Sequence, residues 1–125
     1  MNHPDRIVVA LGLLALAAVA GPVGGTQDAG KSRLQAERVL LDNRKVRVLE
    51  YTSRPSGGVC GVDRHSHPAH VTIVMEAARD REAPEGGKPV ESDLKVGDVL
   101  WSEAGTHVDV NVGSTNSRLI VVEIK

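Results

Sequence analysis

Short apolar segments follow one another along the chain from residue 39 to its end. In two of them, 46–48 and 107–111, apolar and polar residues alternate, and a period of two is typical of a half-buried β-strand. Residues 71–75 are dense in β-branched side chains and are predicted to form a strand buried on both faces. Residues 119–124 are similar and predict a buried strand that closes the chain.

Turn signals separate these segments, at Asn43-Arg44, 54–58 and 83–89. After the first 20 residues, no window of ten or more shows helical periodicity, apart from a weak pattern over 29–38. Many short strands with Gly- and Pro-containing turns, and without helices, predict an all-β sandwich or barrel.

The first 20 residues have a different pattern. Residues 7–20 are an unbroken run of 14 apolar residues and glycines, preceded by Arg6 and ending in Ala18-Val19-Ala20. A membrane-spanning helix needs roughly 20 such residues, whereas a shorter run that ends in small residues is typical of a secretory signal. We expect residues 1–20 to be a Sec-type signal peptide, cleaved after Ala20, and the product to be periplasmic or secreted. A retained N-terminal anchor is the alternative.

The expected organisation is therefore a signal peptide over 1–20, a flexible or partly helical leader over 21–38 and one compact domain over 39–125. Fifteen Lys and Arg and sixteen Asp and Glu give a formal net charge of −1, which excludes a strongly basic nucleic-acid-binding protein. Aromatic residues are 2% of the chain, so base-stacking surfaces have little to be built from. We expect no membrane span after cleavage.

Cys60 is the only cysteine, so an internal disulfide is excluded. We expect a buried thiol that packs like a small hydrophobic residue. An intermolecular disulfide and a reactive thiol are the alternatives.

Three histidines lie within six residues, in the sequence His65-Ser66-His67-Pro68-Ala69-His70. On a strand, residues i and i+2 point to the same face, so His65 and His67 can present two imidazoles to one point. Pro68 interrupts strict alternation and allows His70 to turn back towards that point. His107 begins a later alternating run and shares its face with Asp109 and Asn111. An inward-facing polar set of this kind needs a reason, such as a metal or a ligand, whereas an outward-facing one does not.

The number and spacing of these imidazoles predict a divalent transition metal held by His65, His67, His70 and His107. Imidazole suits Fe, Zn, Mn, Ni and Cu, and the ligand type alone does not choose among them. We expect Asp109 to be a solvated carboxylate. The alternative is that it accepts a hydrogen bond from a ligating histidine.

Taken together, these residues resemble the two sequence motifs of the cupin superfamily, whose fold is a double-stranded β-helix or jelly-roll barrel. The first motif contains His-x-His followed by a glutamate, and His65-Ser66-His67 matches its start. The second runs from a glycine through a second glycine and a histidine to an asparagine, and it is matched in order by Gly97, Gly105, His107 and Asn111. The resemblance covers about residues 44–124 and implies a cupin-type barrel.

The chain departs from the family pattern at four places. One residue, Thr106, separates Gly105 from His107 instead of two, and the glycine expected near Ala77-Ala78 is missing. No glutamate follows His67 at the usual spacing, where Val71 and Thr72 stand, and Glu103 replaces the proline of the second motif. The resemblance to small cupins with His-x-His-Pro-x-His implies that His70 takes the place of the carboxylate. The fourth ligand is thus either His70 or a carboxylate.

Three functions fit this sequence. The first is a metal-dependent enzyme acting on a small metabolite, by dioxygenase- or isomerase-like chemistry. The second is a non-catalytic cupin that binds a metal or small ligand, and the third is a barrel whose histidines hold no metal. Cupins frequently pair through an edge strand, and outward-facing Val108, Val110 and Val112 would supply an apolar patch. We therefore expect a homodimer.

Overall fold

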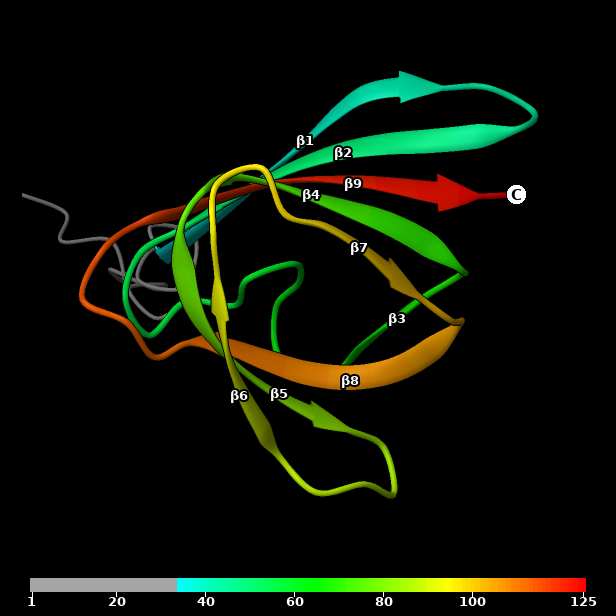
Figure 1. Ribbon diagram of the computed structural model, residues 1–125. Coiled ribbons are helices and arrows are strands. Elements are labelled where there is room, and N and C mark those ends of the chain that lie inside the picture. Colours follow the sequence, from blue (N-terminus) through cyan, green and yellow to red (C-terminus); the bar gives the residue numbers. More distant parts are fainter. Residues whose placement is uncertain (1–33) are drawn as a thin grey trace, which may run out of the picture.

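Two facing β-sheets make up the part of the protein described by the computed structural model, residues 34–125 (Figure 1). The strands are β1 (Gln35–Asp42), β2 (Val46–Ser53), β3 (His65–His67), β4 (His70–Glu76), β5 (Ala78–Pro84), β6 (Val90–Leu94), β7 (Val99–Ser102), β8 (Gly105–Asn111) and β9 (Ser117–Ile124). One sheet has the order β1-β2-β9-β4-β7 and the other β3-β8-β5-β6, and all their pairings are antiparallel. The all-β prediction is confirmed.

The first strand begins at Gln35, four residues before the domain start expected at residue 39. β1 pairs with β2 along its whole length, from Gln35 opposite Ser53 to Asp42 opposite Arg47. Residues 35–38 are mostly polar and lie at the edge of the sheet, so no apolar pattern in the sequence predicts this part of the strand. The expected signal peptide, its cleavage site and the leader up to residue 33 lie outside the described residues. No helix within 34–125 is long and apolar enough to span a bilayer.

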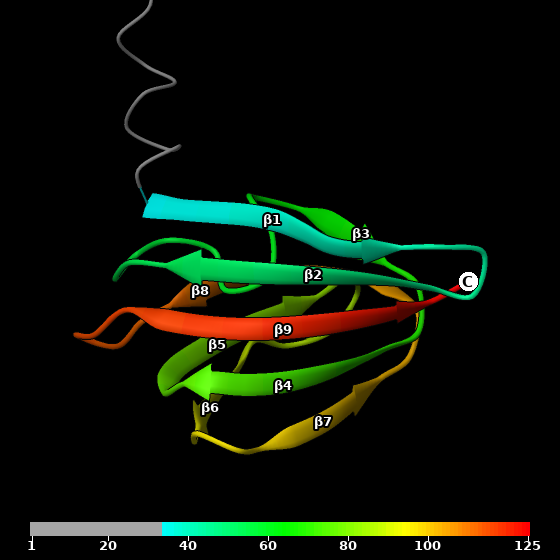
Figure 2. The same ribbon diagram turned by 90° about the horizontal axis from the view of Figure 1, so that it is seen from above.

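The core lies between the two sheets. Its largest contribution comes from the inner face of the five-stranded sheet, seen face-on in Figure 2, through Leu49, Tyr51, Val74, Leu119 and Val121. In β4 the residues from His70 to Val74 alternate between buried and half-buried, and Met75 is exposed, so the expectation of burial on both faces is wrong for 71–75. The outer face of this sheet is solvated, as one face of an antiparallel sheet commonly is.

The segment between β2 and β3, residues 54–64, turns inward over residues 57–61 and returns to the surface at 62–64 (Figure 1). Val59 and Cys60 in this segment are both buried. Both belong to the hydrophobic core, whereas Val62 in the same segment is 52% exposed. This segment therefore becomes one wall of the barrel interior.

Strand β8 turns its polar face inward. Asp109 and Asn111 are buried, whereas the alternate residues Val108 and Val110 are half-buried on the opposite face. The valines thus point away from the barrel interior, as the dimer expectation assumed. However, β8 lies between β3 and β5 and is not an edge strand. The polar face of β8 thus points inward, where Asp109 and Asn111 both hydrogen-bond to groups of the protein.

Candidate metal centre

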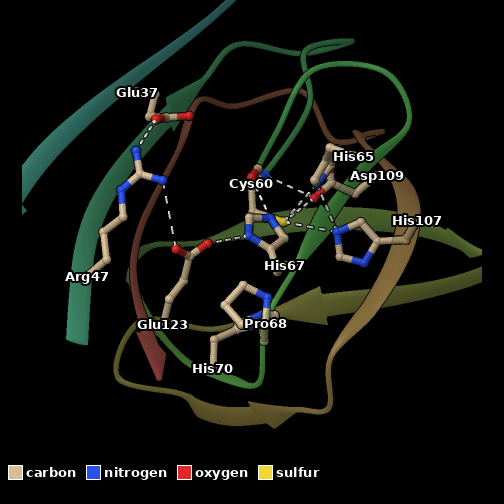
Figure 3. Close-up of polar contacts among 10 residues, drawn as sticks. All are labelled: Glu37, Arg47, Cys60, His65, His67, Pro68, His70, His107, Asp109 and Glu123. Atoms are coloured by element: carbon tan, nitrogen blue, oxygen red, sulfur yellow. Dashed lines mark hydrogen bonds and ion pairs between the residues drawn. The ribbon is translucent and has the colours of Figure 1, made fainter. Parts of the chain in front are cut away.

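Three predicted ligands and the lone cysteine converge at one end of the barrel interior. His65 and His67 come from β3, His107 from β8 and Cys60 from the segment before β3 (Figure 3). β3 pairs with β8 so that His65 lies directly opposite His107. One donor atom from each of the four residues lies within 4.8 Å of the donor atoms of all the others. We call these four residues the donor cluster.

The distances inside the donor cluster fit a small transition metal. Nε2 of His65 and Nε2 of His107 are 2.9 Å apart, and Cys60 Sγ lies 3.7 Å and 3.5 Å from these two atoms. Metal–nitrogen and metal–sulfur bonds of about 2.0 Å and 2.3 Å at tetrahedral angles place nitrogen and sulfur about 3.5 Å apart, and two nitrogens about 3.3 Å apart. Cys60, His65 and His107 need to move by only a few tenths of an ångström to meet this geometry. His67 lies within 4.8 Å of these donors and has further to move.

Each cluster histidine is oriented by an oxygen acceptor behind it. Nδ1 of His65 lies 2.9 Å from the carbonyl oxygen of Asp63, and Nδ1 of His107 lies 3.2 Å from a carboxylate oxygen of Glu82. Nδ1 of His67 lies 2.8 Å from Glu123 Oε1. A hydrogen bond donated by Nδ1 leaves the Nε2 lone pair free to ligate, and such partners are usual behind metal-bound histidines. Nε2 of His67, in contrast, faces the carbonyl oxygen of Cys60 at 3.0 Å.

Glu123 contacts the donor cluster through His67 and is not among the residues that the sequence pattern predicts. It is 7% exposed and lies between His67 and Arg47, whose guanidinium is 3.9 Å from its carboxylate and 3.6 Å from that of Glu37 (Figure 3). This row of charges connects β3 to β9, β2 and β1. The signal that could have found it is a single acidic residue inside the apolar run 119–124.

Asp109 is not a solvated carboxylate, which corrects the first expectation for this residue. It is 3% exposed and accepts hydrogen bonds from the backbone N–H groups of Val59 and Cys60, both at 2.9 Å. It also accepts the thiol hydrogen of Cys60, with Sγ 2.6 Å from Oδ2. Asp109 therefore fixes the segment that carries Cys60.

Cys60 is buried as expected, but its thiol also makes polar contacts, with Asp109 and with the cluster histidines. Burial and the neighbouring Asp109 raise the pKa of the thiol well above its ordinary value, so the sulfur keeps its proton while it faces that carboxylate. A bound cation reverses this balance, because it favours the thiolate. Burial also lowers the pKa of His107, which favours the neutral imidazole that a metal needs.

His70 lies outside the donor cluster, although the sequence analysis predicted it as a ligand. It is 3% exposed, and its Nδ1 lies 2.8 Å from the carbonyl oxygen of Pro68 (Figure 3). The reason is topological: His70 begins β4, which pairs with β7 and β9 in the other sheet. Its ring centroid is still 5.1 Å from that of His67, so it borders the cluster.

A cavity of about 110 Å³ adjoins the donor cluster. Cys60 and His107 lie on its wall, and so does His70. The remaining wall combines carboxylates and hydroxyl groups with leucine side chains. The cavity is large enough to admit several water molecules or a small ligand beside the cluster.

No protein-family profile matches the chain, and no curated protein matches its sequence. Solved structures do match. A cupin domain from Bordetella pertussis Tohama I is 25% identical with a TM-score of 0.64, over 73% of this chain and 93% of that one. An RmlC-like cupin family protein with a double-stranded β-helix fold from Methanocaldococcus jannaschii is 13% identical with a TM-score of 0.60, over 74% of this chain and 81% of that one. The DMSP lyase DddQ from Ruegeria pomeroyi DSS-3 is 14% identical with a TM-score of 0.63, over 82% of this chain and 52% of that one.

Proposed function

Because the chain belongs to the cupin superfamily, we propose that it is a metalloprotein whose donor cluster binds one divalent transition metal beside a cavity for a small molecule. In this proposal His65, His67, His107 and Cys60 hold the ion. His70 borders the site without binding the ion.

One observation carries this proposal. The Nδ1 atoms of His65 and His107 each face an oxygen acceptor, while their Nε2 atoms face each other at 2.9 Å. If both Nδ1 atoms carry hydrogen, two lone pairs meet at this distance and repel each other. A cation between them removes the repulsion and satisfies both nitrogens.

The donor types narrow the choice of metal. Three imidazoles and a thiolate suit Zn²⁺, Cu, Ni²⁺ or Fe²⁺, whereas Mn²⁺ prefers oxygen ligands. To ligate, Cys60 exchanges its hydrogen bond to Asp109 for the metal, and His67 gives up the contact of 3.0 Å between its Nε2 and the Cys60 carbonyl oxygen. Asp109 keeps its two backbone N–H donors and so still holds the segment in place.

Catalysis on a small molecule is the second candidate function, favoured by the cavity that opens on Cys60 and His107. A metal there would supply a Lewis acid for a bound water or substrate. The structural neighbours include an enzyme, the DMSP lyase DddQ. In this chain, Asp80, Glu82 and His70 line the same cavity and are the groups placed to hold or move a proton.

Metal analysis of the full chain, produced without a histidine tag, tests the proposal. We expect one equivalent of metal in the wild type and in His70→Ala, and loss of metal in His107→Ala. Replacement by Co²⁺ gives a thiolate-to-metal charge-transfer band in the near ultraviolet if Cys60 ligates. Cys60→Ser should abolish that band. Wild-type protein without bound metal would contradict the proposed function, and a wild-type Co²⁺ form without the band would remove Cys60 from the ligand set.

A further inference from the structure

The cavity beside the donor cluster contains an acidic group whose hydrogen-bonding capacity is only partly used, by the backbone N–H of Val110. Asp80 lies on β5, between Asn111 on β8 and Ser92 on β6. Its Oδ1 atom is buried and has no hydrogen-bond partner among the described residues. A buried carboxylate oxygen without a donor is costly, so such an atom commonly marks a place where a ligand or a water supplies the donor.

The other carboxylates on this wall are already occupied. Asp109 accepts hydrogen bonds from Val59 and Cys60, and Glu82 contacts Nδ1 of His107. Asp80 is thus the acidic residue of the cavity wall that is left with a buried, unpartnered oxygen. Burial and the neighbouring Asp109 and Glu82 also raise the pKa of Asp80, to about 7.

Positive side chains are absent from the described wall of this cavity. Arg79 and Arg81, the sequence neighbours of Asp80, point to the outer face, where both bind Glu91. The charge of Asp80 is therefore not balanced by the protein. Even with a divalent ion in the donor cluster, three carboxylates and a thiolate leave an excess of negative charge around the cavity.

We propose that Asp80 binds the ammonium group of a small amine in this cavity. The proposal rests on the proposed function for the presence of the metal, but it names a group and a ligand class that the metal site does not determine. An amine supplies both a positive charge and N–H donors to the unpartnered oxygen, and the hydroxyl groups of Thr72, Ser92 and Ser102 on the same wall can accept its remaining hydrogens. Anionic ligands are repelled by the same carboxylates.

Ethylammonium and ethanol are the probes, because they match in size and differ in charge. We would titrate each into the zinc-loaded full chain at pH 8 and follow backbone amide shifts by nuclear magnetic resonance. We expect ethylammonium to bind at least tenfold more tightly than ethanol, with shifts in β5 and β6. Asp80→Asn should remove this preference, and so should Asp80→Ser if the amide variant folds poorly. Asp93→Asn, the same change at an exposed position of β6, should keep it.

Equal affinity of the two probes for the wild type, or an unchanged preference in both Asp80 variants, overturns the amine assignment. Metal content is measured on the same samples. A zinc-loaded protein without the preference contradicts only this inference, whereas failure to load zinc contradicts the proposed function. The two failures are therefore separate observations.

Discussion

Nε2 of His65 lies 2.9 Å from Nε2 of His107, and the Nδ1 atom of each ring lies close to an oxygen, the carbonyl oxygen of Asp63 and a carboxylate oxygen of Glu82. A single proton can bridge such a pair only if one ring becomes positively charged or changes its tautomer. A transition metal imposes neither requirement, since neutral imidazoles with free Nε2 lone pairs are its preferred ligands. The backbone pairing of β3 with β8 is what produces this relationship.

The buried carboxylate behind His67 gives a prediction for metal affinity. Glu123→Gln keeps the shape of the side chain but removes the charge that orients the His67 ring. We expect metal affinity to fall by about 10- to 100-fold, as is usual when such a partner is lost. Competition with a metal-binding dye measures this. Glu85→Gln is the matched control, because Glu85 is exposed and pairs with Arg64. Equal affinities for the two variants would show that Glu123 does not support the site.

His70→Ala separates stability from metal binding. The ring is buried and hydrogen-bonded to Pro68, so its removal leaves a cavity and should lower the free energy of unfolding by about 1–3 kcal/mol. Metal content should stay at one equivalent, because His70 lies outside the donor cluster. Chemical denaturation and metal analysis measure the two effects. Loss of metal from a folded His70→Ala protein would restore His70 as a ligand.

Asp80 makes stability depend on pH in a defined direction. Its pKa is raised from 3.8 to about 7 by burial and by Asp109 and Glu82, so the folded state holds a proton that the unfolded state releases. The ionised Asp80 carboxylate destabilises the folded state. This effect is absent below about pH 4, grows as the pH rises towards 7 and is constant above that.

Asp80→Asn should therefore raise the melting temperature of the metal-free protein at pH 8. After allowance for solvent screening, we expect the free energy of unfolding to rise by about 1 kcal/mol, which corresponds to an increase in melting temperature of about 4–8 °C. Near pH 4 the gain should disappear, as thermal denaturation at the two pH values would reveal. The exposed Asp93→Asn is the control. An equal gain at both pH values would mean that the charge of Asp80 is not its cause.

A homodimer remains a prediction, and the structure points to a different patch for it. Val108 and Val110 are only half-exposed in an inner strand, whereas Val39, Leu40 and Leu41 are 45–49% exposed on β1 at the edge of its sheet. Exposed apolar edge strands favour association. Light scattering should give twice the chain mass for the wild type and the chain mass for Leu40→Lys. A monomeric wild type at micromolar concentration would contradict this prediction.

Export is predicted from the sequence alone. Cleavage after Ala20 should leave Gly21 as the first residue of the protein in the exported fraction. N-terminal sequencing or intact mass determines this. An intact Met1 in that fraction would support the retained anchor instead.

The barrel and most of the donor cluster were predictable because their signals are local. Alternation around His107 and the His-x-His pair fix which side chains share a face, and this depends only on strand geometry. No local pattern links Cys60 to Asp109, so the sequence predicts a thiol that packs as an apolar side chain and a solvated carboxylate. They bond to each other across 49 residues, and only the folded segment between the sheets brings them together.

For His70, a favourable local spacing predicts a ligand that the structure places outside the donor cluster. Its spacing from His67 is favourable, yet the chain changes sheets between the two residues, and a local pattern does not contain that change. Glu123 was missed for a related reason. Its partner His67 is 56 residues away, so only tertiary structure identifies the pair.

The shortest strand of the barrel, β3, has three residues and pairs only with β8 among the described strands, yet it carries two members of the donor cluster. A third member lies in the irregular segment just before it, and the fourth is 47 residues from Cys60 in sequence. An ion bound by all four would act as a non-covalent cross-link that restricts the least regular part of the domain. Local opening of residues 59–67 would then become rare, and their amide hydrogens would exchange slowly with solvent only in the loaded protein.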